Sequence, residues 1–157
     1  MLNGKATVFL SCSSFFKLTV AYPFSDALER IDMQGVILED APIIGERWEP
    51  EEKLELYLNK SDAFLALCTP DDHLDDGSIQ TRPNIIDEIA RARGKGHLRD
   101  RMAIFKEVSV KLPSNINPTY ERLEVEDPTR AIDRFLAQLL AWGFKVPTMS
   151  RRRSGHR

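Results

Sequence analysis

Short apolar segments typical of strands alternate along this chain with longer segments whose apolar residues recur at helical spacing. The strand-like segments are 6–10, 36–38, 63–68, 102–105 and 123–125, and the helical ones are 24–34, 49–59, 84–93 and a last helix after Asp127. This alternation predicts βαβ units with a parallel sheet covered by helices on both faces. The segment Ala63–Cys68 is apolar throughout, so we expect it to be a central strand.

The simplest fold with five such strands is an α/β, flavodoxin-like three-layer sandwich with strand order 2-1-3-4-5. The 157 residues suit one domain, because domains commonly contain about 100–200 residues. We expect the domain to span residues 1–146, with a basic tail at 147–157. The last helix should bury one stripe of side chains, formed by Ile132, Phe135, Leu136, Leu139 and Leu140.

The charge distribution limits the partners of the chain. The net charge is −2, and four arginines lie in the last seven residues, so the remainder carries −6. An acidic body argues against direct nucleic-acid binding. No apolar run reaches the roughly 20 residues that span a bilayer, so we expect no membrane insertion. Cys12 and Cys68 lie in apolar stretches and are expected to be free thiols, as is typical of the reducing cytoplasm.

Polar residues follow the first and third predicted strands. Ser11 and Ser13 leave the first strand, and Asp71 leaves the third. In a 2-1-3-4-5 sheet, the carboxyl ends of these two strands flank the crevice in which ligands bind. We therefore consider Ser11, Ser13 and Asp71 candidates for substrate binding. The alternative is that these residues only turn the chain and cap helices.

The segment from Arg82 to Ile89 is the most distinctive in the sequence. Pro83 favours a helix start, and Asn84 and Glu88 then share one face, four residues apart. Isoleucines occupy the other side, and Asp87 can pair with Arg91 toward solvent. In one interpretation Glu88 is a surface carboxylate paired with a nearby arginine. In the other it is an acid at the rim of the crevice, beside cationic Arg82 and the amide of Asn84.

Several common motifs are absent. The sequence has neither a Gly-x-Gly-x-x-Gly dinucleotide fingerprint nor a phosphate-binding Gly-x-x-x-x-Gly-Lys loop. The acidic run at 71–76 lacks the ligand spacing of a calcium loop, so we expect no metal site.

Three short motifs together resemble those of the TIR-like nucleotide-binding family, which includes effector domains of bacterial anti-phage systems of the CBASS and Pycsar kind. They are Thr69-Pro70-Asp71-Asp72, then Arg82-x-Asn84-Ile85-x-x-Glu88, then Pro113-Ser114-Asn115-Ile116. The motifs occur in the family's order, and the resemblance runs from about Ala6 to Phe144. It implies a TIR-like domain at residues 1–146.

The resemblance implies that NAD is a substrate, not a cofactor, and is cleaved between nicotinamide and ribose, with Glu88 as the catalytic acid residue. Arg82 and Arg47 are then candidates for binding the diphosphate, because a guanidinium matches phosphate oxygens. Trp48 either stacks on a base or forms a hydrophobic staple for the helix at 49–59. Asn84 would contact substrate beside Glu88.

Related effectors imply two further expectations. We expect the chain to work as a homo-oligomer, with a separate nucleotide-sensing domain or chain as its partner. Two other function classes remain open from the sequence: an N-glycosidase or deoxyribosyltransferase-like enzyme acting on nucleosides or nucleotides, and a non-catalytic TIR scaffold. Glu88 argues against the scaffold, which needs no acid at that position.

Overall fold

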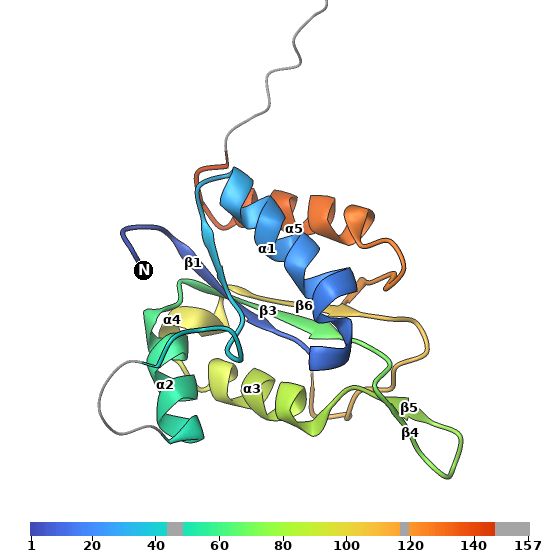
Figure 1. The fold of residues 1–157 in the computed structure, drawn as a ribbon. Helices are drawn as coiled ribbons and strands as arrows, with labels where there is room; N and C mark the ends of the chain where they lie inside the picture. The colour runs from blue at the N-terminus through green and yellow to red at the C-terminus, as the bar shows by residue number, and fades with distance from the viewer. Residues whose placement is uncertain (44–48, 117–119, 147–157) are drawn as a thin grey trace, which may run out of the picture.

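A parallel five-stranded sheet forms the centre of the molecule (Figure 1). The computed structural model describes residues 1–43, 49–116 and 120–146. The strands of the sheet, in their spatial order, are β2 (Gln34–Val36), β1 (Thr7–Ser11), β3 (Ala63–Cys68), β6 (Met102–Lys106) and β7 (Glu121–Arg122). Counting only these strands along the chain, the order is 2-1-3-4-5, which confirms the predicted flavodoxin-like topology.

Helices cover both faces of the sheet and complete the three layers (Figure 1). One face carries α1 (Tyr22–Arg30) and α5 (Thr129–Ala141). The other carries α2 (Pro50–Lys60), α3 (Pro83–Arg93) and the short α4 (Gly96–Arg99). Within the described part of the chain, no helix has both the length and the apolar character needed to cross a membrane.

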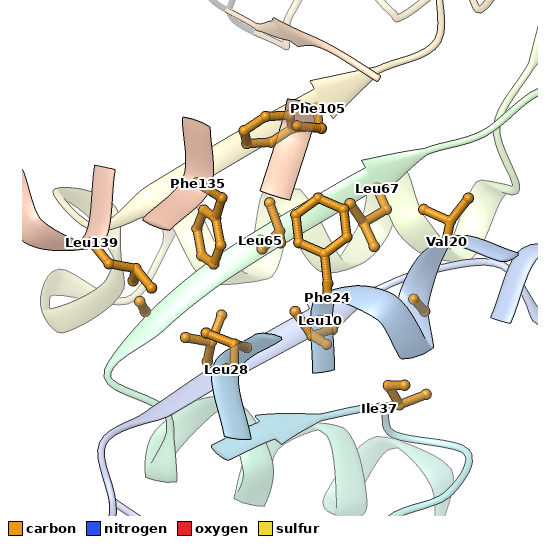
Figure 2. Packing of buried hydrophobic residues seen from close by; sticks show 14 of the residues in the cluster. Leu10, Val20, Phe24, Leu28, Ile37, Leu65, Leu67, Phe105, Phe135 and Leu139 are labelled. Carbon is orange, nitrogen blue, oxygen red and sulfur yellow. The ribbon is translucent and has the colours of Figure 1, made fainter. Parts of the chain in front are cut away.

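Alternation along β1 sends neighbouring side chains to opposite faces. Leu10 packs into the cluster beneath α1 and α5, whereas Phe9 packs beneath α2 and α3 and stacks on Phe64 at 5.6 Å between ring centroids. Figure 2 shows the centre of the first cluster, where Phe24 meets Phe105 and Phe135 edge to face. The same period of two directs Ser11 toward the α3 side, the side of Phe9.

The segment between the first two strands differs from the prediction. A 3-10 turn, η1 (Ser14–Phe16), and a π-helical turn, η2 (Lys17–Ala21), precede α1, and neither was predicted. The helix expected at 24–34 ends at Arg30, because Asp32 adopts a left-handed conformation (φ 61°) that turns the chain early. The second strand therefore begins at Gln34 and not at Val36.

Two predictions near the C-terminus are wrong. The fifth strand lies at Glu121–Arg122 and not at 123–125, because Glu121 and Arg122 pair with the last two residues of β6. Leu140 is 56% exposed and lies outside the buried stripe of α5, whereas Phe135 and Leu139 are fully covered. Leu140 follows Leu139 directly, and the 100° step between them turns it out of the stripe.

The prediction also missed a small hairpin formed by β4 (Asp72–His73) and β5 (Ile79–Gln80), which projects beside the start of α3 (Figure 1). The acidic run at 71–76 is part of this hairpin. Cys12 and Cys68 are free thiols. They lie against the clusters on opposite faces of the sheet, so the sheet separates them.

Candidate active site

A cavity of about 430 Å³ opens where β1 and β2 end and where α2 and α3 begin. This volume is within the range of small-molecule sites, roughly 300–1,000 Å³. The residues that line it are Leu10, Cys12, Ser13, Ser14, Ile37, Leu38, Glu39, Pro50, Lys53, Arg82, Asn84 and Glu88. Like other sites in doubly wound sheets, the cavity lies outside the carboxyl ends of strands. The predicted position between the first and third strands is wrong, because the lining residues follow β1 and β2 and include none from β3 or from residues 69–72.

Glu88 is the buried acid of this cavity. Its side chain lines the cavity although the residue is only 6% exposed. Burial raises the pKa of its carboxyl to about 7, because a charge is poorly solvated there. The hydroxyl of Ser11 donates a hydrogen bond to Glu88 Oε2 at 3.4 Å and acts in the opposite direction, lowering the pKa. At neutral pH the carboxyl is thus balanced between its two protonation states.

Helical geometry explains why Glu88 faces inward. Ile85 and Ile89 are fully buried against the sheet, and Glu88 lies about 60° from Ile85 around α3, at the edge of the same buried side. The isoleucines are therefore not on the side of α3 opposite to Glu88, as was predicted. Asp87 points outward and accepts a hydrogen bond from Arg91 at 2.9 Å, which confirms the predicted pair. Arg91 also forms ion pairs with two acids on α2. Because Glu88 is buried, its interpretation as a surface carboxylate paired with a nearby arginine is wrong.

Arg82, just before α3, and Asn84, in its first turn, line the same cavity. The Arg82 guanidinium lies over the ring of Phe15, 4.8 Å from its centroid. This contact holds Arg82 against the segment that follows β1. On the other side Arg82 approaches Asp72 at 3.8 Å, an ion pair at the limit of contact. Residues from the segment after β1 and from the β4–β5 hairpin thus meet at one guanidinium.

The hydroxyls of Ser11 and Ser13, which were predicted to bind substrate, each form a hydrogen bond within the protein. Ser11 is fully buried behind the cavity wall, where its hydroxyl donates a hydrogen bond to Glu88. Ser13 lines the cavity, but its hydroxyl accepts a hydrogen bond from the backbone N–H of Phe15 at 3.2 Å and so caps η1. Both serines therefore support the geometry of the cavity wall.

Asp71 lies beside the cavity and is not among the residues that line it. Its carboxylate accepts hydrogen bonds from the hydroxyl of Thr69 (2.7 Å), the hydroxyl of Thr81 (3.0 Å) and the backbone N–H of Arg82 (2.8 Å). These contacts close the base of the β4–β5 hairpin and satisfy an N–H at the start of α3. These contacts are of the turn-forming kind that was weighed as the alternative, and substrate binding by Asp71 stays a prediction.

A second polar cluster holds the wall formed after β2. Lys17 in η2 forms ion pairs with Asp40 at 2.7 Å and with Glu39 at 3.4 Å. The hydroxyl of Tyr22 donates a hydrogen bond to the other Asp40 oxygen at 2.8 Å. The hydrogen bond from Lys17 keeps the pKa of Asp40 below its ordinary value. Glu39 lines the cavity, so its ion pair with Lys17 ties the cavity wall after β2 to η2.

Three residues with polar or ionisable side chains that line the cavity were not among the predicted site residues: Cys12, Glu39 and Lys53. Burial and the nearby Glu88 charge raise the pKa of Cys12 to about 12, so its thiol is a poor nucleophile at neutral pH. Lys53 could have been found, because the N-terminus of the helix after the second strand opens on the same edge of the sheet. The predicted ligands Arg47 and Trp48 lie outside the described residues.

Taken together, the doubly wound sheet and the cavity with a buried acid at the carboxyl ends of its strands define an α/β domain with a candidate small-molecule site. A family model described as "CAP12/Pycsar effector protein, TIR domain" matches residues 7–122, from β1 through β7, and includes Glu88. The chain therefore belongs to the CAP12/Pycsar effector TIR-domain family. A search of curated proteins returned no match.

Proposed function

We propose that this TIR domain hydrolyses NAD at the nicotinamide–ribose bond, that Glu88 is its catalytic residue, and that it acts as an anti-phage effector activated by self-association. The observation that carries the proposal is a buried carboxyl lining a cavity of small-molecule size, beside an amide and two cationic side chains. Membership of a TIR effector family supports the same reading. Residues 1–146 would form the domain, and an additional sensing domain or chain would control it.

The chemistry needs few catalytic groups. When the bond between ribose C1′ and the nicotinamide nitrogen breaks, its electron pair goes to the nitrogen, and nicotinamide leaves as a neutral molecule. A positive charge then develops on the ribose, as in other glycosidic cleavages. A carboxylate held beside the ribose in a poorly solvated cavity stabilises that charge. Water adds to C1′ and releases a proton, which gives ADP-ribose.

The environment of Glu88 suits this role. A carboxyl with a pKa near 7 is only partly ionised in the empty cavity. A bound pyridinium cation would favour the ionised form, because an opposite charge nearby lowers the pKa of a carboxyl. Asn84 on the preceding turn of α3 and Arg82 just before the helix line the same cavity and would contact the substrate outside the reacting bond. Ionisation would thus be coupled to substrate binding.

The test measures nicotinamide release from NAD by the purified protein over a range of protein concentrations, including assembled forms isolated by size. We expect release by the assembled protein and a loss of about 10²–10³-fold or more in Glu88→Gln. Asp87→Asn is the matched control, because it neutralises the neighbouring acid, which points outward to Arg91. It should change the rate by about twofold at most.

Three outcomes would contradict the proposal. They are full turnover in Glu88→Gln, equal losses in Glu88→Gln and Asp87→Asn, and the absence of nicotinamide from every assembled form. A parallel incubation with deoxynucleosides separates the alternatives. Release of free base there, without nicotinamide release from NAD, would favour a nucleoside N-glycosidase. Assembly without either product would favour a non-catalytic scaffold.

A further inference from the structure

Two cationic side chains from different helices line the cavity that contains Glu88. Arg82 immediately precedes α3, and Lys53 belongs to the first turns of α2. Arg82 has a side chain that is 41% exposed, and Lys53 is half-buried, whereas Glu88 is 6% exposed. The two cations are therefore nearer to solvent than the acid is, and the cavity has a deep acidic part and an outer basic part.

Lys17, and not Lys53, forms the ion pairs with the two described acids that follow β2. Glu39, the other acid among the lining residues, is paired with Lys17, which also holds Asp40. Within residues 1–43, 49–116 and 120–146, Lys53 forms no ion pair, and Arg82 has only the 3.8 Å contact with Asp72. Two cations that are weakly paired in one cavity favour an anionic ligand.

The backbone adds to this preference. Both α2 and α3 are 11 residues long, and both begin with a proline at the cavity end. The helix dipole makes each of these ends favourable for negative charge, part of which the chain supplies through Glu51 and Glu52 in α2 and through Asp71, which accepts a hydrogen bond from the backbone N–H of Arg82. The cavity is lined by Pro50 at one helix end and by Arg82 and Asn84 at the other, so both helix N-termini border it.

We propose that Lys53 acts with Arg82 as a phosphate-recognition pair at the outer part of the cavity, so that the site selects substrates carrying a diphosphate over the corresponding nucleosides. This inference rests on the proposed function and adds a specificity residue to it. An ammonium and a guanidinium on two facing helices can each contact a phosphate group. The guanidinium of Arg82 already lies over the Phe15 ring, 4.8 Å from its centroid. A nucleoside lacks the groups that these cations recognise.

The test measures binding of ADP, inorganic pyrophosphate and adenosine to the whole chain by calorimetry, so that no bond needs to be cleaved. We expect Lys53→Gln to weaken ADP and pyrophosphate binding by about tenfold, and Lys53→Arg to preserve it. Lys60→Gln is the matched control, because it removes the same charge from the other end of α2. It should change each dissociation constant by about twofold at most. Adenosine binding should be unchanged in all three variants.

The outcomes separate this inference from the proposed function. Lys53-dependent ADP binding without any nicotinamide release would support the phosphate subsite and contradict the hydrolase. The subsite is overturned if Lys53→Gln binds ADP as the wild type does, or if adenosine binding is lost to the same extent. It is also overturned if the wild type binds neither ADP nor pyrophosphate. In the active protein, Lys53→Gln should raise KM for NAD while leaving cleavage of nicotinamide riboside unaffected.

Discussion

Ser11 and Glu88, 77 positions apart in the chain, meet in a buried hydrogen bond of 3.4 Å. β1 brings the hydroxyl to the α3 side of the sheet, and α3 brings the carboxyl to the same point. The two elements lie next to each other only in the folded protein. The pKa of Glu88, the proposed catalytic residue, therefore depends on the position of β1, which carries Ser11.

Replacing Ser11 should alter the pH dependence of NAD cleavage. In the wild type, kcat/KM should rise with pH through about 7, because the carboxylate is the active form of Glu88. Ser11→Ala removes a donor that favours the carboxylate, so the midpoint should move to higher pH. The rate at neutral pH should fall by roughly twofold to fivefold. The measurement is the pH profile of nicotinamide release, and an unchanged midpoint would contradict the assigned contact.

Glu88→Gln should make the folded protein more stable at neutral and alkaline pH. The pKa of Glu88 is about 7 when folded and 4.5 in the ordinary state, so the folded chain binds the proton more tightly. Wild-type stability should therefore fall as pH rises from about 4.5 to about 7, and then level off. At about 1.4 kcal/mol for each pKa unit, the gain in Glu88→Gln above that range is at most about 3 kcal/mol.

The readout for this prediction is urea unfolding at several pH values. The two proteins should have similar free energies of unfolding below about pH 4.5 and diverge as the pH increases. A variant that is less stable than the wild type at pH 8 would show that the carboxylate is solvated or paired in the native state. The comparison needs no enzymatic activity, so it tests the burial of Glu88 on its own.

Asp71→Ala should loosen the start of α3. The substitution removes the acceptor of three hydrogen bonds, one of them from the backbone N–H of Arg82. Loss of a comparable helix cap costs about 0.5–2 kcal/mol. Hydrogen exchange of the Arg82 amide should become faster, and the free energy of unfolding should decrease. Asp72→Ala is the control, because its one contact with Arg82 is a 3.8 Å ion pair, and equal effects of the two variants would contradict the assignment.

Specific activity should increase with protein concentration. Phe15 and Leu18 are 67% and 77% exposed, and Phe15 stacks on Arg82 at the cavity. A second copy of the chain covering this region would exclude water from the cavity and strengthen its electrostatic interactions. Nicotinamide release should be measured from nanomolar to micromolar protein alongside light scattering. High specific activity that stays flat over this range, with only monomer present, would rule out activation by self-association.

Local patterns in the sequence were sufficient for the architecture. Periodicity and the uniformly apolar run identified the central strand Ala63–Cys68, and the alternation of strands and helices pointed to a doubly wound fold, of which the simplest five-stranded order proved correct. Pro83 marked the first residue of α3, and spacing of four predicted the contact between Asp87 and Arg91. These features depend on neighbours within one or two helical turns, which the sequence displays directly.

Tertiary structure alone decided which polar groups meet. Asp71 was expected to bind substrate, but its carboxylate accepts hydrogen bonds from Thr69, Thr81 and the backbone N–H of Arg82. These donors come close to Asp71 because the β4–β5 hairpin brings residues 81 and 82 back beside residue 71. Lys53 joined the cavity because α2 begins at the same edge as α3, a relation between elements far apart in the chain. Such contacts are non-local, and no periodicity within a single element encodes them. The sequence by itself determined the layers of this domain, and packing between the layers determined the environment of Glu88.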